Sequence, residues 1–243
     1  MEEVHDLIPE KLKIIQNNRY FKFGTDSVLL ANYVNVKEGD HVLDLGTGSG
    51  VIPLLLSYKQ SPECVIGIEI QPELIELAER NVRLNNLDDI INIVEGDLRN
   101  LDNYIKPGSL DQVVSNPPFM PVGSGKISEN KFKAVARHEL KVKLEDIVRA
   151  ASCALRSGGH FNLVHRAWRM GEVFSLLREY NLEPKKLRIV YPRFGRLADS
   201  FLLKARKDGG CGLKIEPALT VYQKDSNEYT HEVKQMYGED IDE

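Results

Sequence analysis

Cysteine is scarce in this sequence: the 243 residues include only Cys64, Cys153 and Cys211. The three lie far apart and form neither a CxxC pair nor a Cys/His spacing typical of zinc ligands. This argues against a zinc site or a disulfide framework. We therefore predict isolated buried thiols in a reducing compartment, and no bound metal.

Long apolar runs are also absent. Val51–Leu56 is among the strongest, yet it is far shorter than the ~18 residues of a membrane span. The first six residues, MEEVHD, are acidic and contain none of the apolar segment found in a secretory signal. We expect a soluble, cytoplasmic protein with no membrane partner.

Basic residues are in slight deficit overall, because the net charge is −4, but their distribution is uneven. Residues 121–210 contain 19 Lys and Arg against 9 Asp and Glu, a net +10, and the rest of the chain carries −14. A basic segment in an acidic protein can form a positive face that attracts phosphate. Solvated, Lys-rich helix faces are the alternative interpretation.

Short apolar runs alternate with helical patterns between about residues 40 and 208. The predicted strands are His41–Leu45, Val65–Ile70, Ile91–Val94, Leu110–Val114, His160–Val164, Leu187–Tyr191 and Ser200–Ala205; the predicted helices are Val51–Tyr58, Pro72–Asn85, Leu144–Leu155 and Glu172–Tyr180. Such alternation predicts an α/β fold: an open, mostly parallel seven-stranded sheet with helices on both faces. Flanking it are an N-terminal extension (1–39), a basic insertion (119–143) within the domain 40–208, and a tail (209–243).

Ligands of such sheets bind beyond the carboxyl ends of the strands. The first strand ends in Asp44–Gly50, DLGTGSG, whose glycines permit a tight turn and close approach of a ligand to the backbone. A dinucleotide site would have its third glycine where Val51 stands, so pyrophosphate fits less well. Glu69 ends the second strand and can accept both hydroxyls of a ribose, and Asp97 ends the third and can accept from a purine amine. Either acid alone could simply be solvated.

Together these residues resemble the class I S-adenosylmethionine (SAM)-dependent methyltransferases, which have a Rossmann-like fold. In that family the DxGxGxG loop approaches the methionine part of SAM, the acid after the second strand holds the ribose hydroxyls, and the Asp after the third meets the adenine. The matching positions, which the resemblance implies bind SAM, are Asp44, Gly46, Gly48, Glu69 and Asp97.

The fourth strand is followed by Asn116-Pro117-Pro118-Phe119. Prolines fix φ and remove backbone donors, so an isolated NPPF could be no more than a rigid loop end. Beside the inferred SAM site it resembles the (N/D)PP(Y/F) motif of methyltransferases that act on planar exocyclic or amide nitrogens. The resemblance implies that Asn116 borders both SAM and substrate.

The chemistry explains these residue types. The lone pair of an aromatic or amide NH2 is delocalised, and N–H bonds accepted by the Asn116 side-chain oxygen and the Pro117 carbonyl would expose it to the methyl donor. Pro118 and Phe119 would contact the substrate, and stacking of a flipped base on Phe119 is worth roughly 1–3 kcal/mol. No cysteine neighbours the motif, which disfavours carbon methylation.

Further stretches resemble the bacterial tRNA1(Val) adenine-37 N6-methyltransferase family. FKFGTDS at 21–27 resembles an element that lies over SAM there, which implies SAM contacts from Phe23, Gly24, Thr25 and Asp26; a helix cap at Thr25 or Asp26 is the alternative. The ARHE at 136–139 and the tail segments LTVY and YTHEV resemble relatives as well. Lys131, Lys133 and Arg137 of the basic insertion suit RNA phosphate contacts.

We therefore expect SAM-dependent methylation of an exocyclic amine in RNA, first of all adenine N6 in the tRNA1(Val) anticodon loop. Guanine N2 of rRNA stays open because the fourth motif residue is Phe. Protein glutamine N5 uses the same motif, although those enzymes usually carry an N-terminal helical domain for which about 40 residues look too few. An RNA-binding protein with a vestigial SAM fold is the non-enzymatic alternative, and the complete motif set weighs against it. The sequence does not indicate an oligomeric state.

Overall fold

The computed structural model of the protein describes residues 1–18, 20, 23–119 and 142–239. In this part of the chain the central sheet has the order β10-β8-β9-β7-β6-β3-β4-β5, and β11 also pairs with β8. The strands are β3 (His41–Leu45), β4 (Cys64–Glu69), β5 (Ile91–Glu95), β6 (Leu110–Ser115), β7 (Leu155–Arg166), β8 (Leu182–Tyr191), β9 (Ser200–Lys207), β10 (Lys214–Ile215) and β11 (Leu219–Thr220).

Strands β3 to β7 run parallel, and β9 is antiparallel to both β7 and β8. The expected α/β fold is confirmed. Within the described residues the sheet nevertheless has nine strands instead of the expected seven. The two additional strands, β10 and β11, have two residues each and run along β8. A two-residue strand shows no apolar periodicity, so only its pairing partner reveals it.

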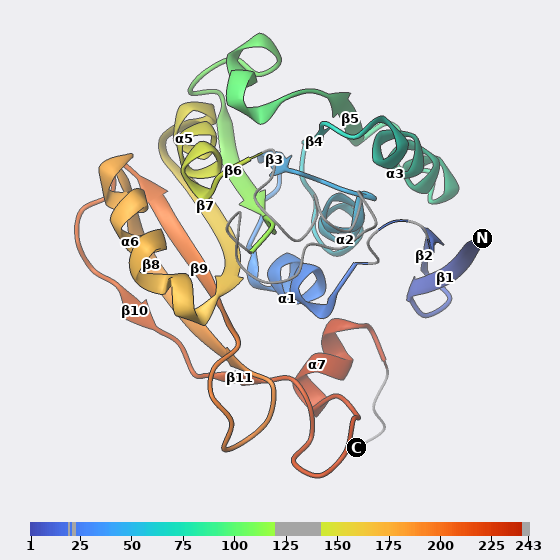
Figure 1. Ribbon diagram of the computed structural model, residues 1–243. Helices are drawn as coiled ribbons and strands as arrows, with labels where there is room; N and C mark the ends of the chain where they lie inside the picture. The colour runs from blue at the N-terminus through green and yellow to red at the C-terminus, as the bar shows by residue number, and fades with distance from the viewer. Residues whose placement is uncertain (19, 21–22, 120–141, 240–243) are drawn as a thin grey trace.

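Helices cover both faces of the sheet (Figure 1). They are α1 (Thr25–Tyr33), α2 (Val51–Lys59) and α3 (Pro72–Leu84) on one face, α5 (Leu144–Ala154) and α6 (Met170–Glu179) on the other, the 3-10 turns η1 (Leu98–Asn103) and η2 (Ala167–Arg169), and the short α7 (His231–Met236). Successive strand residues point to opposite faces. Accordingly, Val42 and Val114 pack in the core under α1 and α2, whereas Leu43 and Val113 pack in the core under α5 and α6.

The N-terminal hairpin, β1 (Glu2–Ile8) and β2 (Leu12–Asn17), is held on α3 by two asparagine side chains. Asn85 accepts from Lys13 N (2.9 Å) and donates to Lys13 O (2.8 Å). Asn81, one helical turn away, pairs with Ile15 N (2.7 Å) and Ile15 O (3.3 Å) and also donates to Ser49 O (2.9 Å). Asn81 thus connects the hairpin to the glycine turn after β3.

Replacing Asn81 by alanine is expected to lower the free energy of unfolding by about 2 kcal/mol. Asn81 is fully buried, so the change leaves Ile15 and Ser49 backbone groups without partners where water does not reach them. A loss of this size lowers Tm by roughly 4–8 °C in a chain of this length. Asn85→Ala is the matched control: Asn85 is only partly buried, water can replace its bonds, and its effect should be clearly smaller. Equal losses would contradict this account.

The tail packs against α1 (Figure 1). Tyr229 stacks between Tyr222 and Tyr237, with ring centroids 5.3 and 5.2 Å apart. The Tyr229 hydroxyl lies 3.1 Å from the hydroxyl of Thr25, the first residue of α1. Residues more than 200 positions apart therefore brace the start of this helix together.

Two further expectations concern exposure. The prediction of buried thiols is wrong: Cys153 and Cys211 are exposed and Cys64 is partly buried, because Cys153 lies on the solvent side of α5 and Cys211 in a polar stretch of the tail. Among the described residues, no helix has both the length and the apolar character needed to cross a membrane.

Candidate active site

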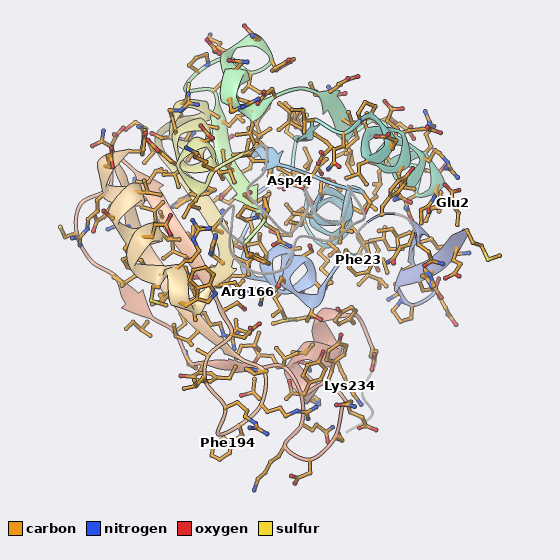
Figure 2. The ribbon with its side chains drawn as sticks, in the orientation of Figure 1. Glu2, Phe23, Asp44, Arg166, Phe194 and Lys234 are labelled. Carbon is orange, nitrogen blue, oxygen red and sulfur yellow. The ribbon has the colours of Figure 1, made fainter. Side chains whose placement is uncertain are left out.

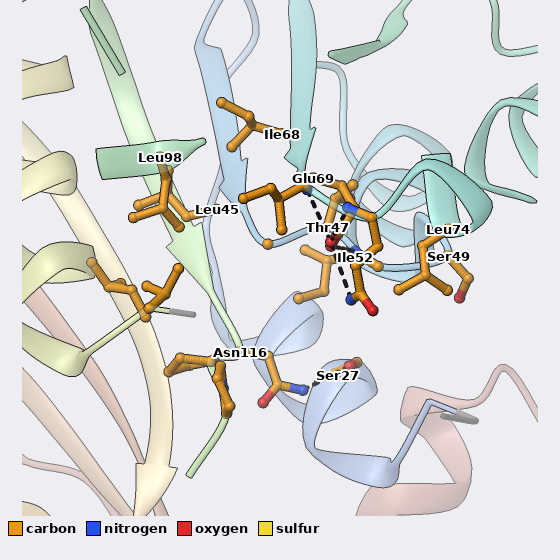
Figure 3. A pocket seen from close by; sticks show the side chains of 18 of the residues that line it. Ser27, Leu45, Thr47, Ser49, Ile52, Ile68, Glu69, Leu74, Leu98 and Asn116 are labelled. Carbon is orange, nitrogen blue, oxygen red and sulfur yellow. Dashed lines mark hydrogen bonds between the residues drawn. The ribbon is translucent and has the colours of Figure 1, made fainter. Parts of the chain in front are cut away.

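A cavity of about 490 Å³ opens at the carboxyl ends of β3, β4 and β6 (Figure 3). Its wall includes these predicted site residues: Phe23, Gly24, Asp26, Gly46, Gly48, Glu69, Asp97, Asn116, Pro117, Pro118 and Phe119. Segments spread over almost 100 positions of the chain thus meet in one place. A volume of this order suits a cofactor or drug-sized ligand.

Other predicted residues lie elsewhere. Thr25 and Asp44 are not part of the cavity wall: Thr25 turns to the tail, and Asp44 is buried behind the glycine turn. Lys131, Lys133 and Arg137 fall outside the described residues. The alternative prediction for this segment is confirmed in that a helix begins at Thr25, but the predicted cap is wrong, because Gly24 occupies the N-cap position and no side chain caps the helix there.

Two glycines shape the turn between β3 and α2. Gly46 (φ 76°) and Gly48 (φ 58°) have left-handed backbone conformations that strain other residues. No heavy atom lies within 4 Å of where a Cβ would stand on either glycine, so the backbone is open to a ligand in the cavity. Gly46 N donates to Ile68 O (3.0 Å), which fixes the turn to the end of β4.

Glu69 holds the other side of this turn. Its Oε2 accepts from Gly48 N (3.0 Å), and its Oε1 accepts from Ile70 N (3.0 Å) and Gln71 N (3.1 Å); Figure 3 shows the carboxylate beside the turn. Both oxygens thus face N–H donors. Glu69 orients the glycine turn in addition to lining the cavity.

For SAM, the cofactor that the sequence resemblance implies, Glu69→Ala is therefore expected to weaken binding roughly tenfold, the value of a hydrogen bond to a charged group. Glu69→Gln should weaken binding too, because in either orientation of the amide its NH2 group would face a backbone N–H donor. Calorimetric titration measures both affinities, and Glu73→Gln, in the exposed first turn of α3, is the control. If the Glu69→Gln variant bound SAM like the wild type, the orienting role would be disproved.

Asp44 is a buried carboxylate without a hydrogen-bond partner among the described residues. Its side chain is fully buried, and both of its oxygens lack such a partner. Burial raises the pKa of Asp44 to about 7, and the nearby charge of Glu69 adds to the rise. The nearby Thr47 hydroxyl opposes this rise in the pKa, although it forms no hydrogen bond with the carboxylate in the described structure. Such a group is suited to a positively charged ligand.

Asp97 already has a cationic partner. Its carboxylate pairs with Arg99, at 2.5 Å from Nη2 and 2.9 Å from Nε, and also accepts from Arg99 N (3.0 Å). It thereby caps η1. A ligand amine at Asp97 would share the carboxylate with this arginine.

Asn116 is oriented by a residue that sequence reasoning missed. Its Nδ2 donates to the Ser27 hydroxyl at 2.8 Å, as the dashed line in Figure 3 shows. The bond crosses from the end of β6 to α1, 89 positions away in sequence. With the amide nitrogen held by Ser27, the Oδ1 acceptor has no protein partner among the described residues.

Phe119 sits within a group of cationic and aromatic side chains. The Arg166 guanidinium lies 4.4 Å from the centre of its ring, and the His165 ring meets it edge-on at 5.4 Å. Arg169 donates to Phe119 O (3.3 Å). Burial lowers the pKa of His165 to about 3, so this imidazole is neutral. Its ring packs between Phe119 and Phe201.

Arg166 is a second missed wall residue. It is the last residue of β7 and pairs with Asp26 (3.3 Å) and with Asp199. Burial raises the pKa of Asp26, and Arg166 opposes the rise. One guanidinium therefore joins the start of α1, the NPPF loop and the β8–β9 connection. A lone arginine at a strand end gives no sequence signal for such a role.

Similarity to known proteins agrees with this site. A family model described as methyltransferase small domain matches residues 20–180. A tRNA1(Val) (adenine(37)-N6)-methyltransferase of Aeromonas salmonicida is 31% identical over 183 residues, 75% of each chain. One from Bacteroides thetaiotaomicron is 27% identical over 216 residues, 87% of this chain and 89% of the relative.

Solved structures show the same fold. A predicted O-methyltransferase from Agrobacterium tumefaciens has a TM-score of 0.69 at 22% identity, covering 87% of this chain and 95% of that one. The M. jannaschii tRNA m1G37 methyltransferase has a TM-score of 0.61 at 16% identity, covering 86% and 57%. The family model spans well over half of the chain, and the Aeromonas relative exceeds 30% identity over three quarters of its own length. The chain therefore belongs to the methyltransferase small domain family and is a member of the tRNA1(Val) (adenine(37)-N6)-methyltransferases.

Proposed function

We propose that the protein transfers a methyl group from SAM to N6 of adenine 37 in the anticodon loop of tRNA1(Val). The observation that carries the proposal is Asn116, whose amide nitrogen is held by Ser27 and whose Oδ1 has no partner among the described residues beside the cavity. The relatives named for this reaction support adenine N6 over the other planar nitrogens.

The residues present fit SAM. The open backbone at Gly46 and Gly48, the Glu69 carboxylate and Asp97 would hold its methionine, ribose and adenine parts. Asp44 lies behind the turn and not in the cavity wall, but its carboxylate, which has no hydrogen-bond partner among the described residues, suits the positive charge of SAM. When bound, SAM supplies a methyl group activated by the sulfonium. Phe23 and Gly24, which directly precede α1, and Asp26, in the first turn of α1, would close the site from that side.

The chain's own residues prepare the nucleophile. The amine of adenine would donate its two hydrogens to Asn116 Oδ1 and the Pro117 carbonyl, which localises the nitrogen lone pair towards the methyl donor. Phe119, with Arg166 against its ring, would stack on the extruded base. No base has to act before transfer, because the proton leaves afterwards.

The test uses labelled SAM with an unmodified tRNA1(Val) transcript and the same transcript carrying guanine at position 37, followed by nuclease digestion and mass spectrometry. Label as N6-methyladenosine in the first transcript alone is expected. N2-methylguanosine would move the substrate to guanine, and transfer only to protein in a cell extract would indicate glutamine. Cofactor binding without any transfer would favour the vestigial fold. Lys131, Lys133 and Arg137 stay predictions as phosphate contacts.

A further inference from the structure

Exposed apolar side chains follow two strands at the carboxyl end of the sheet, which is also the end that carries the active site. Strands β6, β7 and β8 point in the same direction, so the segments that follow them leave the sheet at one edge. NPPF follows β6, η2 follows β7, and the segment 192–199, which we call the 192–199 loop, follows β8. In η2, Trp168 is 62% exposed; in the loop, Phe194 is 77% and Leu197 91% exposed. Figure 2 shows Phe194 at the outer end of the loop.

The loop is anchored at both ends. At its start, Tyr222 N donates to Pro192 O (3.0 Å), and Arg193 donates to Gln223 O (2.7 Å) and Asn227 Oδ1 (2.5 Å). At its end, Asp199 N donates to Val190 O (3.0 Å). The tail thus holds the loop in place, and Phe194 and Leu197 are presented to solvent from a fixed frame.

The loop is also connected to the active site. Ala167 N donates to Asp199 O (3.0 Å), which ties η2 to the end of the loop. The Asp199 carboxylate pairs with Arg166, whose guanidinium lies over Phe119. Arg166 therefore contacts both the 192–199 loop, through Asp199, and the NPPF motif, through Phe119.

The 192–199 loop presents a positive charge to solvent. Arg196 is exposed and forms no ion pair within the described residues. The loop's own acid, Asp199, is paired with Arg166. Exposed aromatic rings on the same loops as a guanidinium without an ion-pair partner are the chemistry that binds unstacked bases and phosphates. An enzyme that extrudes one base must also hold the nucleotides next to it.

We propose that Trp168, Phe194, Arg196 and Leu197 form a docking surface for the RNA that flanks the target nucleotide. The aromatic rings stack on bases or pack against sugars, and the Arg196 guanidinium donates to a phosphate. This inference rests on the proposed RNA substrate. It assigns to the tail a purpose that its sequence did not reveal: holding the 192–199 loop.

Binding of an unmodified tRNA1(Val) transcript, followed by fluorescence anisotropy over a range of salt concentrations, tests the surface. Phe194→Ala and Trp168→Ala should each raise Kd roughly tenfold, as expected for a lost stacking contact, and Phe194→Tyr should retain binding. Arg196→Ala should reduce the salt slope by roughly one. The affinity for SAM, measured by calorimetry, should be the same in all four variants.

Two exposed residues outside the proposed docking surface provide controls. Ile215→Ala, on the edge strand β10, matches the loss of apolar surface, and Arg178→Ala, in the last turn of α6, matches the loss of charge; neither should change RNA affinity. If the wild type binds the transcript and the loop variants bind it equally well, the docking surface is wrong and the proposed function stands. If the wild type does not bind tRNA, both the docking surface and the proposed function are wrong. A changed oligomeric state with unchanged RNA affinity would make this face a contact between copies instead.

Discussion

Asn116→Ala is expected to lower kcat roughly a hundred- to thousand-fold, the range measured when one preorganised polar group is removed from a transition-state site. The substituted side chain no longer accepts an N–H of the substrate amine, so the nitrogen lone pair stays delocalised. SAM affinity should be nearly unchanged, because the glycine turn and Glu69 are untouched. Single-turnover methylation and calorimetric SAM titration separate the two effects.

Ser27→Ala gives a graded comparison. It leaves Asn116 in place but removes the 2.8 Å bond that orients the amide, so kcat should fall by less than in Asn116→Ala, by roughly tenfold for one lost neutral hydrogen bond. Both variants should have the Tm of the wild type. If Asn116→Ala lost SAM binding and turnover equally, Asn116 would be a cofactor ligand and the role in activating the amine would be wrong.

The elements of the sheet were predictable because their signals are local. His41–Leu45 is found where it was expected, since an apolar run followed by Asp44–Gly50 allows little else. The positive φ of Gly46 and Gly48 follows from the same short motif. The ends of longer strands were less certain: β7 begins at Leu155, five residues before the predicted His160, because Arg156, Ser157 and two glycines interrupt its apolar pattern.

The connections between elements were not predictable, because they join residues far apart in sequence. Ser27 meets Asn116 across 89 positions, and Thr25 meets Tyr229 across 204. The resemblance assigned Thr25 to the cofactor, whereas its hydroxyl lies against the tail. The role of Arg166 follows from three partners on three segments. Short-range periodicity carries none of this information.

Asp44→Asn is expected to stabilise the free protein and to weaken SAM binding. The folded-state pKa of Asp44, about 7, lies above the value of about 3.9 for an unfolded aspartate. The folded state therefore binds more protons between these values, and this carboxylate makes the protein less stable as pH rises from about 4 to about 7. Asparagine has nearly the same shape and carries no charge to bury.

The stability advantage of the variant should therefore grow with pH. Between pH 5.5 and pH 8 we expect it to increase by about 2 kcal/mol, or roughly 4–8 °C in Tm for a chain of this length. Thermal unfolding of both proteins at the two pH values, without SAM, measures it. Because every other titrating group is common to the two proteins, the difference isolates Asp44. An advantage that stayed constant or shrank would show that Asp44 is already ionised at pH 5.5.

SAM binding should respond in the opposite sense. A cationic ligand favours the ionised carboxylate, so below pH 7 the wild type must lose a proton from Asp44 to bind, and its Kd should rise by up to about tenfold per pH unit. The asparagine variant should show no such dependence and should bind roughly a hundredfold more weakly at pH 8, which corresponds to a ligand-induced fall of about two units in the pKa. Titrations from pH 5.5 to 8 decide between the possibilities. Equal pH dependence in both proteins would mean that Asp44 is not coupled to SAM and shapes the turn alone, whereas a flat variant beside a sloping wild type would make this buried carboxylate the partner of the cofactor's charge.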